Sequence, residues 1–280
     1  MTSFFRRYAR NKGAVVGLVI AALVIVVAAL AGVVYPESPW NSVAEPLLDP
    51  LADMDYPLGT DMLGRDVAAG LAHGARVSLL VGLVSTSVAT LIGISIGAVA
   101  GYFGGRIDDL LMRFTEFFQT IPTLAMAVVL VAIFQPSITS IISAIAVVSW
   151  PPVARLVRGE FMSLRSREFV QAAVVIGQSS PRIIFTQILP NTMSPIIVTA
   201  SLMIATAILT ESALSFLGLG DRNLMSWGFM IGAARTMIRD AWWMSFLPGV
   251  AILLTVLAVN LIGEGLNDAL NPHLRSRDGA

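Results

Sequence analysis

The sequence predicts an all-α integral membrane protein with six transmembrane helices and both termini in the cytoplasm. Of its 280 residues, 56% are hydrophobic and 13% are charged, whereas a typical soluble domain carries about 25% charged residues. The apolar residues gather in runs that, with help from their flanks, can cross roughly 30 Å of hydrocarbon. The basic residues gather in alternate connecting segments, and this bias sets the orientation.

The N-terminal part of the chain predicts a basic head, a first span and an outer segment. Residues 1–13 form the cytoplasmic head, and residues 14–35 form an uncharged first transmembrane helix. A secretory signal peptide is the alternative, but the apolar run is too long and no clean cleavage site follows it. Residues 36–76 are acidic and rich in turn formers, so we expect an extracytoplasmic segment with an amphipathic helix.

Five further spans form a core over residues 77–264. We expect them near residues 77–100, 120–134, 138–150, 195–209 and 246–262. The span at 138–150 can continue through Pro151 and Pro152 to Val153.

Two segments complete the predicted topology. Residues 210–245 are too interrupted for an ordinary helix and return to the outer side. Within them, Trp242 and Trp243 are expected to anchor at the bilayer interface, where tryptophan is enriched. Residues 265–280 form a cytoplasmic tail.

The distribution of arginine and lysine supports this orientation. The predicted inner segments hold thirteen of them: Arg6, Arg7, Arg10, Lys12, Arg106, Arg113, Arg155, Arg158, Arg165, Arg167, Arg182, Arg275 and Arg277. The predicted outer segments hold five: Arg65, Arg76, Arg222, Arg235 and Arg239. The excess places a loop at about residues 155–192 in the cytoplasm.

A helix–turn–helix of soluble character lies inside this loop, at residues 168–191. Gly177 sits where the first helix should stop, because glycine takes a left-handed position without steric cost. Ser180 and Pro181 suit the N-cap and first position of a second helix, which Pro190 should end. A sharply bent helical pair at a membrane face is a shape suited to binding another protein.

The loop resembles the cytoplasmic coupling loop of ATP-binding cassette (ABC) importer permeases. That signature reads Glu-Ala-Ala, three residues, Gly, nine residues and Ile-x-Leu-Pro. The matching residues are Ala172, Ala173, Gly177, Leu189 and Pro190, while Gln171 and Gln187 replace the Glu and the Ile.

Further segments resemble permeases of the dipeptide/oligopeptide type. They are residues 59–66, 74–79, 101–105, 154–159, 214–220 and 226–228, in the family's order. One departure is Ala69-Gly70, where the family often has Ser-Arg. The resemblance implies a type I ABC importer permease fold and a role as the permease subunit of a di- or oligopeptide importer.

The resemblance also implies partners and a site. The partners are a second homologous permease subunit, two ATP-binding subunits or domains, and an extracytoplasmic peptide-binding protein, in a bacterial or archaeal plasma membrane. The residues implied to couple the chain to the ATPases are Gln171, Ala172, Ala173, Gly177, Leu189 and Pro190, with Ala172 and Ala173 permitting close approach. ATP and Mg²⁺ belong to the partner subunits, because this chain has no phosphate-binding Gly-x-x-x-x-Gly-Lys-Ser/Thr loop.

Glu211 is the main ionisable residue in the predicted hydrocarbon interiors, at the outer end of the fifth span. A charge at the bilayer centre costs roughly 2.5–3.5 kcal/mol on insertion scales, so such a residue faces protein or water. Two interpretations stay open. Glu211 lines or gates a pathway together with Ser215 and Phe216, or it hydrogen-bonds the bent segment that follows it.

Gly93, Gly97 and Gly101 repeat every four residues, which places them on one face of the second span. Such a stripe lets a neighbouring backbone approach closely. We therefore expect helix packing from these glycines and no pore function.

Catalytic and metal-binding patterns are not apparent in the sequence. The chain has no cysteine, and neither His73 nor His273 has a metal-ligand partner at helical spacing. Asp108 and Asp109 are adjacent, so on a helix they point about 100° apart and favour a capping or interfacial role. We expect no enzyme activity, metal or cofactor in this chain and no nucleic-acid partner. The alternatives are import of nickel chelates, haem or another small solute, or, less favoured, a membrane-embedded enzyme or a scaffold.

Overall fold

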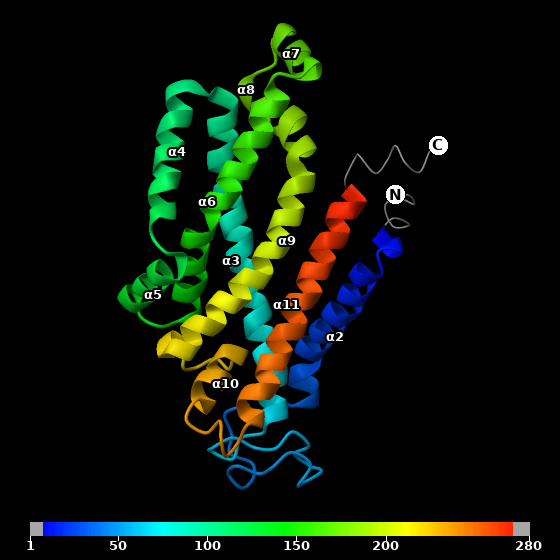
Figure 1. The fold of residues 1–280 in the computed structure, drawn as a ribbon, viewed down its shortest axis with the longest axis vertical. Coiled ribbons are helices and arrows are strands. Elements are labelled where there is room, and N and C mark those ends of the chain that lie inside the picture. The colour runs from blue at the N-terminus through cyan, green and yellow to red at the C-terminus, as the bar shows by residue number, and fades with distance from the viewer. Residues whose placement is uncertain (1–7, 271–280) are drawn as a thin grey trace.

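The computed structural model describes residues 8–270, which form a bundle of long helices running between two ends of the molecule (Figure 1). At one end, α7 (Glu168–Val175) and α8 (Ser180–Ile183) form a projection that we call the tip, residues 166–183. At the other end lie α10 (Trp227–Ala234) and an irregular segment that we call the cap, residues 36–66. Among the described residues only two isolated β-bridges occur, Ser42–Arg65 and Thr60–Asp66. The predictions for residues 1–7 of the head and 271–280 of the tail lie outside the described residues.

Five helices are long and apolar enough to cross a membrane, and a bent helix pair raises the number to six. The five candidate spans are α2 (Lys12–Val34), α3 (Val67–Phe103), α6 (Ile138–Arg165), a continuous helical stretch Ser180–Leu219, and α11 (Trp243–Leu270). The bent pair consists of α4 (Gly105–Thr120) and α5 (Thr123–Phe134). The higher number matches the predicted six-helix plan.

Helix α3 begins ten residues before the predicted start of the second span. Asp66 caps its N-terminus by accepting a hydrogen bond from the Ala68 amide, at 2.8 Å. The first turns then pack on α10 (Trp227–Ala234), where Gly70 lies against Met230 and Gly74 against Trp227. Within residues 36–76 the helical part, residues 67–76, is the start of α3, and its residues 67–75 are buried or half-buried.

The third predicted span, residues 120–134, is a broken one. The chain bends by 86° between α4 and α5, because Ile121 and Pro122 adopt extended backbone angles. Helix α5 has 12 residues, about 18 Å at 1.5 Å per residue, and is too short to cross a bilayer alone.

Helix α6 runs through Pro151 and Pro152 to Arg165, well past the expected end near residue 150. Each proline removes one backbone donor, but the ring fixes φ near the helical value. Immediately beyond them, Val153, Val157 and Phe161 are completely buried in a core that also holds Ala98 of α3. Packing on α3 therefore stabilises the helix where local preference would end it.

The prediction that Pro190 ends the second loop helix is wrong. Helix α8 (Ser180–Ile183), the π-helical turn η1 (Ile184–Ile188), α9 (Leu189–Leu214) and the π-helical turn η2 (Ser215–Leu219) are continuous. The Leu189 amide donates to the Ile184 carbonyl, five residues back. This wider turn precedes Pro190 and shifts the hydrogen-bond register where the proline has no amide hydrogen.

The two tryptophans before α11 behave differently from one another. Trp242 is half exposed, in keeping with an interfacial anchor. Trp243 is buried, and its indole Nε1–H donates to the Thr60 carbonyl of the cap at 3.2 Å. The expectation of an anchor is therefore wrong for Trp243, which joins α11 to the cap.

Candidate functional site

The tip is shaped by the way helix α7 (Glu168–Val175) ends. Gly177 has φ +77°, so it adopts the expected left-handed conformation. Its amide donates to the Val174 carbonyl at 2.9 Å, and the Gln178 amide donates to the Ala173 carbonyl at 3.1 Å. These two bonds form a Schellman motif, which satisfies the last carbonyls of α7 and reverses the chain. The next N-cap is Ser179, one residue before the predicted Ser180.

One face of α7 is fixed to the body of the protein. Val170 and Ala173 are buried in the core cluster that contains Ile183 of α8 and Phe161 of α6. Ala173 therefore supports the tip from inside. Ala172 is exposed and remains available.

The other face of the tip exposes apolar side chains. Val175 and Ile176 are 86% and 73% exposed, and Phe169 and Val174 are also exposed. Residues 174–176 are consecutive, and exposed apolar side chains on a projecting turn are typical of a surface that another protein covers.

The remaining predicted coupling residues shape the tip or the helix that follows it. The side-chain amide of Gln171 donates to the Arg165 carbonyl at 3.0 Å and closes the turn between α6 and α7. A glutamate could not donate this bond, so the departure from the family signature has a structural role here. Leu189 and Pro190 lie at the start of α9, directly after η1.

Glu211 lies near the opposite end of the same helical stretch, and it is only 2% exposed. Its Oε1 accepts hydrogen bonds from the hydroxyls of Ser215 at 2.8 Å and Ser226 at 2.7 Å. Its Oε2 has a longer contact of 3.5 Å with the Ser212 hydroxyl. We call these four residues the Glu211 cluster. Glu211 and Ser215 are buried and Phe216 is exposed, an arrangement in which Glu211 hydrogen-bonds the bent segment that follows it.

The cluster holds α10 against α9, and Trp227 beside it holds α10 against α3. The Ser226 hydroxyl also caps α10, because it accepts from the Phe229 amide at 3.1 Å. The Trp227 indole donates to the Leu71 carbonyl of α3 at 2.9 Å. A Cβ at Gly228 would lie 2.5 Å from Cα of Ser212, so only glycine permits this close approach to α9.

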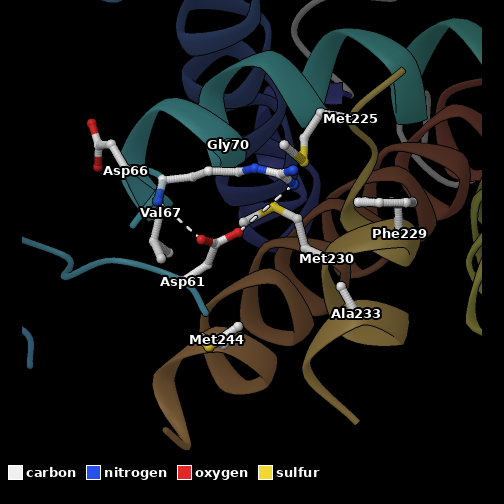
Figure 2. Close-up of a pocket in the computed structure, with 10 residues that line it drawn as sticks. Asp61, Asp66, Val67, Gly70, Met225, Phe229, Met230, Ala233 and Met244 are labelled. Atoms are coloured by element: carbon white, nitrogen blue, oxygen red, sulfur yellow. Dashed lines mark hydrogen bonds and ion pairs between the residues drawn. The ribbon is translucent and has the colours of Figure 1, made fainter. Parts of the chain in front are cut away.

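A small cavity of about 30 Å³ lies beside α10, between the start of α3 and α11 (Figure 2). Three methionines, Met225, Met230 and Met244, line it together with Asp61, Arg65 and Asp66. Burial raises the pKa of the Asp66 carboxyl, although the Ala68 and Ala69 amides that bond to it oppose the shift.

The glycine stripe forms the contact between α3 and α6. A Cβ at Gly93 would lie 2.5 Å from Cβ of Val153, and a Cβ at Gly101 would lie 2.6 Å from Cβ of Phe161. Gly97 faces the Ala154 carbonyl and Val157 in the same way. The three glycines thus let the two backbones approach closely.

An ion pair that the sequence did not reveal joins α4 to α6. The Arg158 guanidinium donates to both carboxylate oxygens of Asp108, at 2.5 and 2.6 Å. The two residues are fifty positions apart, so local sequence gives no signal for their contact. Over residues 8–270, no group of three or more His, Cys, Asp or Glu side chains is placed to hold a metal ion.

Comparison with known proteins places these features in a family. Residues 93–276 match the family described as the inner membrane component of binding-protein-dependent transport systems. The chain belongs to this family. Residues 1–50 match the N-terminal transmembrane domain of oligopeptide transport permease C. The tip, the glycine stripe and the Glu211 cluster of this permease all fall within the first match.

Full-length relatives support the same assignment. The permease is 41% identical to the di/tripeptide transport system permease protein DppC of Pseudomonas aeruginosa, over 99% of this chain and 93% of that protein. It is also 41% identical to the dipeptide transport system permease protein DppC of Bacillus subtilis, over 97% of this chain and 85% of that protein.

Solved structures show that the fold is that of ABC transporter permeases. An inward-facing structure of the MetNI methionine ABC transporter matches with a TM-score of 0.61 at 15% identity, over 72% of this chain and 96% of that one. An amino acid ABC transporter determined with histidines matches with a TM-score of 0.52 at 14% identity, over 68% of this chain and 89% of that one. The type I importer permease fold is therefore established for this chain.

Proposed function

We propose that this chain is a transmembrane subunit of an ATP-driven importer that moves di- or oligopeptides into the cytoplasm. The observation that carries the proposal is the match at 41% identity, over 99% of the chain, to a relative named as a di/tripeptide transport permease. The chain contributes passage through the membrane and has no hydrolytic role of its own.

In this proposal the tip docks on the ATPase. Its apolar outer face supports the assignment, because Phe169, Val174, Val175 and Ile176 are exposed on a projection whose inner face is anchored in the core. An ATPase groove that covers these side chains would gain roughly 25 cal/mol for each Å² of apolar surface removed from water. ATP and Mg²⁺ are held in the ATPase subunits, and closure of these subunits on ATP moves the tip as a rigid lever.

The assembly then contains a second homologous permease subunit, two ATP-binding subunits or domains and an extracytoplasmic peptide-binding protein. It lies in a bacterial or archaeal plasma membrane with the tip in the cytoplasm and the cap outside. The excess of arginine and lysine in the segments predicted to lie on the same side as the tip supports this orientation.

Purification of the chain from its own cells in mild detergent tests the proposal. We expect a second permease and two ATPase chains or domains to purify with it, and radiolabelled di- and tripeptide uptake to fall when the chain is deleted. A chain that purifies alone would contradict the importer assignment. A deletion that spares peptide uptake but abolishes uptake of a nickel chelate or haem would keep the machinery and change the cargo.

A further inference from the structure

The Glu211 cluster stands at one end of a continuous helical path through the protein. The stretch Ser180–Leu219 begins in the tip and ends in η2, and its 40 residues span on the order of 60 Å. Figure 1 shows the tip and α10 at opposite ends of the bundle. A displacement of the tip can therefore reach the α10 end through one element.

Helix α10 is not part of that path and needs a connection to it. The Ser226 hydroxyl supplies one, because it accepts from the Phe229 amide of α10 and donates to Glu211 of α9. A second set of bonds joins the same segment to α3, through the Trp227 indole and the Leu71 carbonyl. The bonds to Glu211 and the close packing of Gly228 on Ser212 thus join α10 to α9, while the Trp227 bond joins the same segment to α3.

The geometry at Glu211 indicates an acceptor role and no dependence on charge. Both short hydrogen bonds, from Ser215 and Ser226, end on the same oxygen, Oε1. Glu211 is buried, and the donors recorded around it are serine hydroxyls, without an ion pair in the part of the chain that the structure describes. A glutamine could keep both bonds through its own Oε1.

We infer that Glu211 is a positioning residue that makes α10 move with α9, so that displacement of the tip changes the position of α10 at the opposite face of the membrane. The inference rests on the proposed importer function and assigns this carboxyl the task of coupling the two faces. Loss of the Glu211 carboxylate as a hydrogen-bond acceptor should uncouple ATP hydrolysis from transport.

The test uses the complete importer with Glu211→Leu and Glu211→Gln. Leucine has a similar volume but leaves the Ser215 and Ser226 hydroxyls without their acceptor. We expect Glu211→Leu to lower the ratio of radiolabelled di- and tripeptide uptake to ATP hydrolysis at least about tenfold, with hydrolysis itself retained. Glu211→Gln should keep a ratio within about twofold of the native one. Ser212→Ala is the matched control, because the Ser212 hydroxyl donates to the Ile208 carbonyl at 2.9 Å and has only a long contact of 3.5 Å with Glu211.

Two results would overturn the inference. If Glu211→Gln loses uptake as severely as Glu211→Leu, the charge matters and a pathway role replaces the positioning role. If uptake and hydrolysis fall together in Glu211→Leu, the cluster only maintains the fold.

Two further comparisons keep the test decisive. If Glu211→Leu does not accumulate in the membrane, Ser226→Ala takes its place, since it removes the donor that joins α10 to Glu211; Ser226→Thr, which keeps a hydroxyl for both bonds, is its control. We then expect a fall of several-fold in the same ratio, and an unchanged ratio would contradict the inference. Failure of the native complex to take up any peptide would instead reject the proposed function, and the inference with it.

Discussion

At Gly177 a single backbone angle determines the direction in which the tip projects. Its φ of +77° lies in the left-handed region, and no atom would lie within 4 Å of an added Cβ. A side chain there is therefore opposed by backbone strain alone, roughly 1–2 kcal/mol and more for a β-branched residue. The shape of the tip depends on this residue even though its surroundings are open.

We predict that Gly177→Val abolishes peptide uptake and weakens ATPase binding, because valine resists the angle that closes the Schellman motif. Uptake in cells and co-purification of the ATPase would measure the two effects. Gly159→Val is the control, since Gly159 in α6 also has open space around it but no positive φ. Normal uptake by correctly inserted Gly177→Val protein would show that the prediction is wrong.

At the scale of elements, the Asp108–Arg158 pair connects α4 to the long helix α6. Arg158 binds both carboxylate oxygens, a two-point contact that neither an amide nor a lysine reproduces. The Arg158 side chain is 34% exposed, so solvent screens part of the attraction.

We predict that Asp108→Asn lowers the free energy of unfolding by about 1 kcal/mol, below the roughly 1.5–3 kcal/mol of hydrogen bonds to charged groups because Arg158 is partly exposed. Thermal unfolding of the purified complex would measure the loss. Asp109→Asn is the matched control, because Asp109 is exposed on the adjacent position of α4. Exchange of the two residues, Asp108→Arg with Arg158→Asp, should recover part of the loss; equal stability of all variants would argue against a structural role.

The sequence could predict those features of the elements that depend on local residues, but not those that depend on contacts between distant residues. The left-handed turn at Gly177 is a local property of glycine, and the spacing of Gly93, Gly97 and Gly101 places them on one face whatever they contact. The predicted end of the fourth span near residue 150 and the predicted helix end at Pro190 were wrong. Local proline rules do not include packing on α3 or the π-helical turn before Pro190. The inward orientation of Ala173 and the serines around Glu211 likewise depend on residues distant in sequence or on neighbouring helices.

For the whole molecule, the tip and the cap lie at opposite ends of the bundle, so they should face opposite sides of the membrane (Figure 1). The chain contains no cysteine, and any introduced cysteine can therefore be labelled without background. Val175 in the tip is 86% exposed and Met54 in the cap is 82% exposed, so each substitution leaves the packing unchanged.

We predict that a membrane-impermeant maleimide labels Met54→Cys in intact cells and labels Val175→Cys only after the membrane is opened. The reason is the excess of thirteen basic residues over five, which holds the tip side in the cytoplasm. Ala127→Cys is the control for access, since Ala127 is fully buried and should remain unlabelled under both conditions. The reverse pattern would invert the orientation and remove the tip from the reach of a cytoplasmic ATPase. With the expected pattern, slower labelling of Val175→Cys in the assembled importer than in the separated chain would locate ATPase contact at this face of the tip.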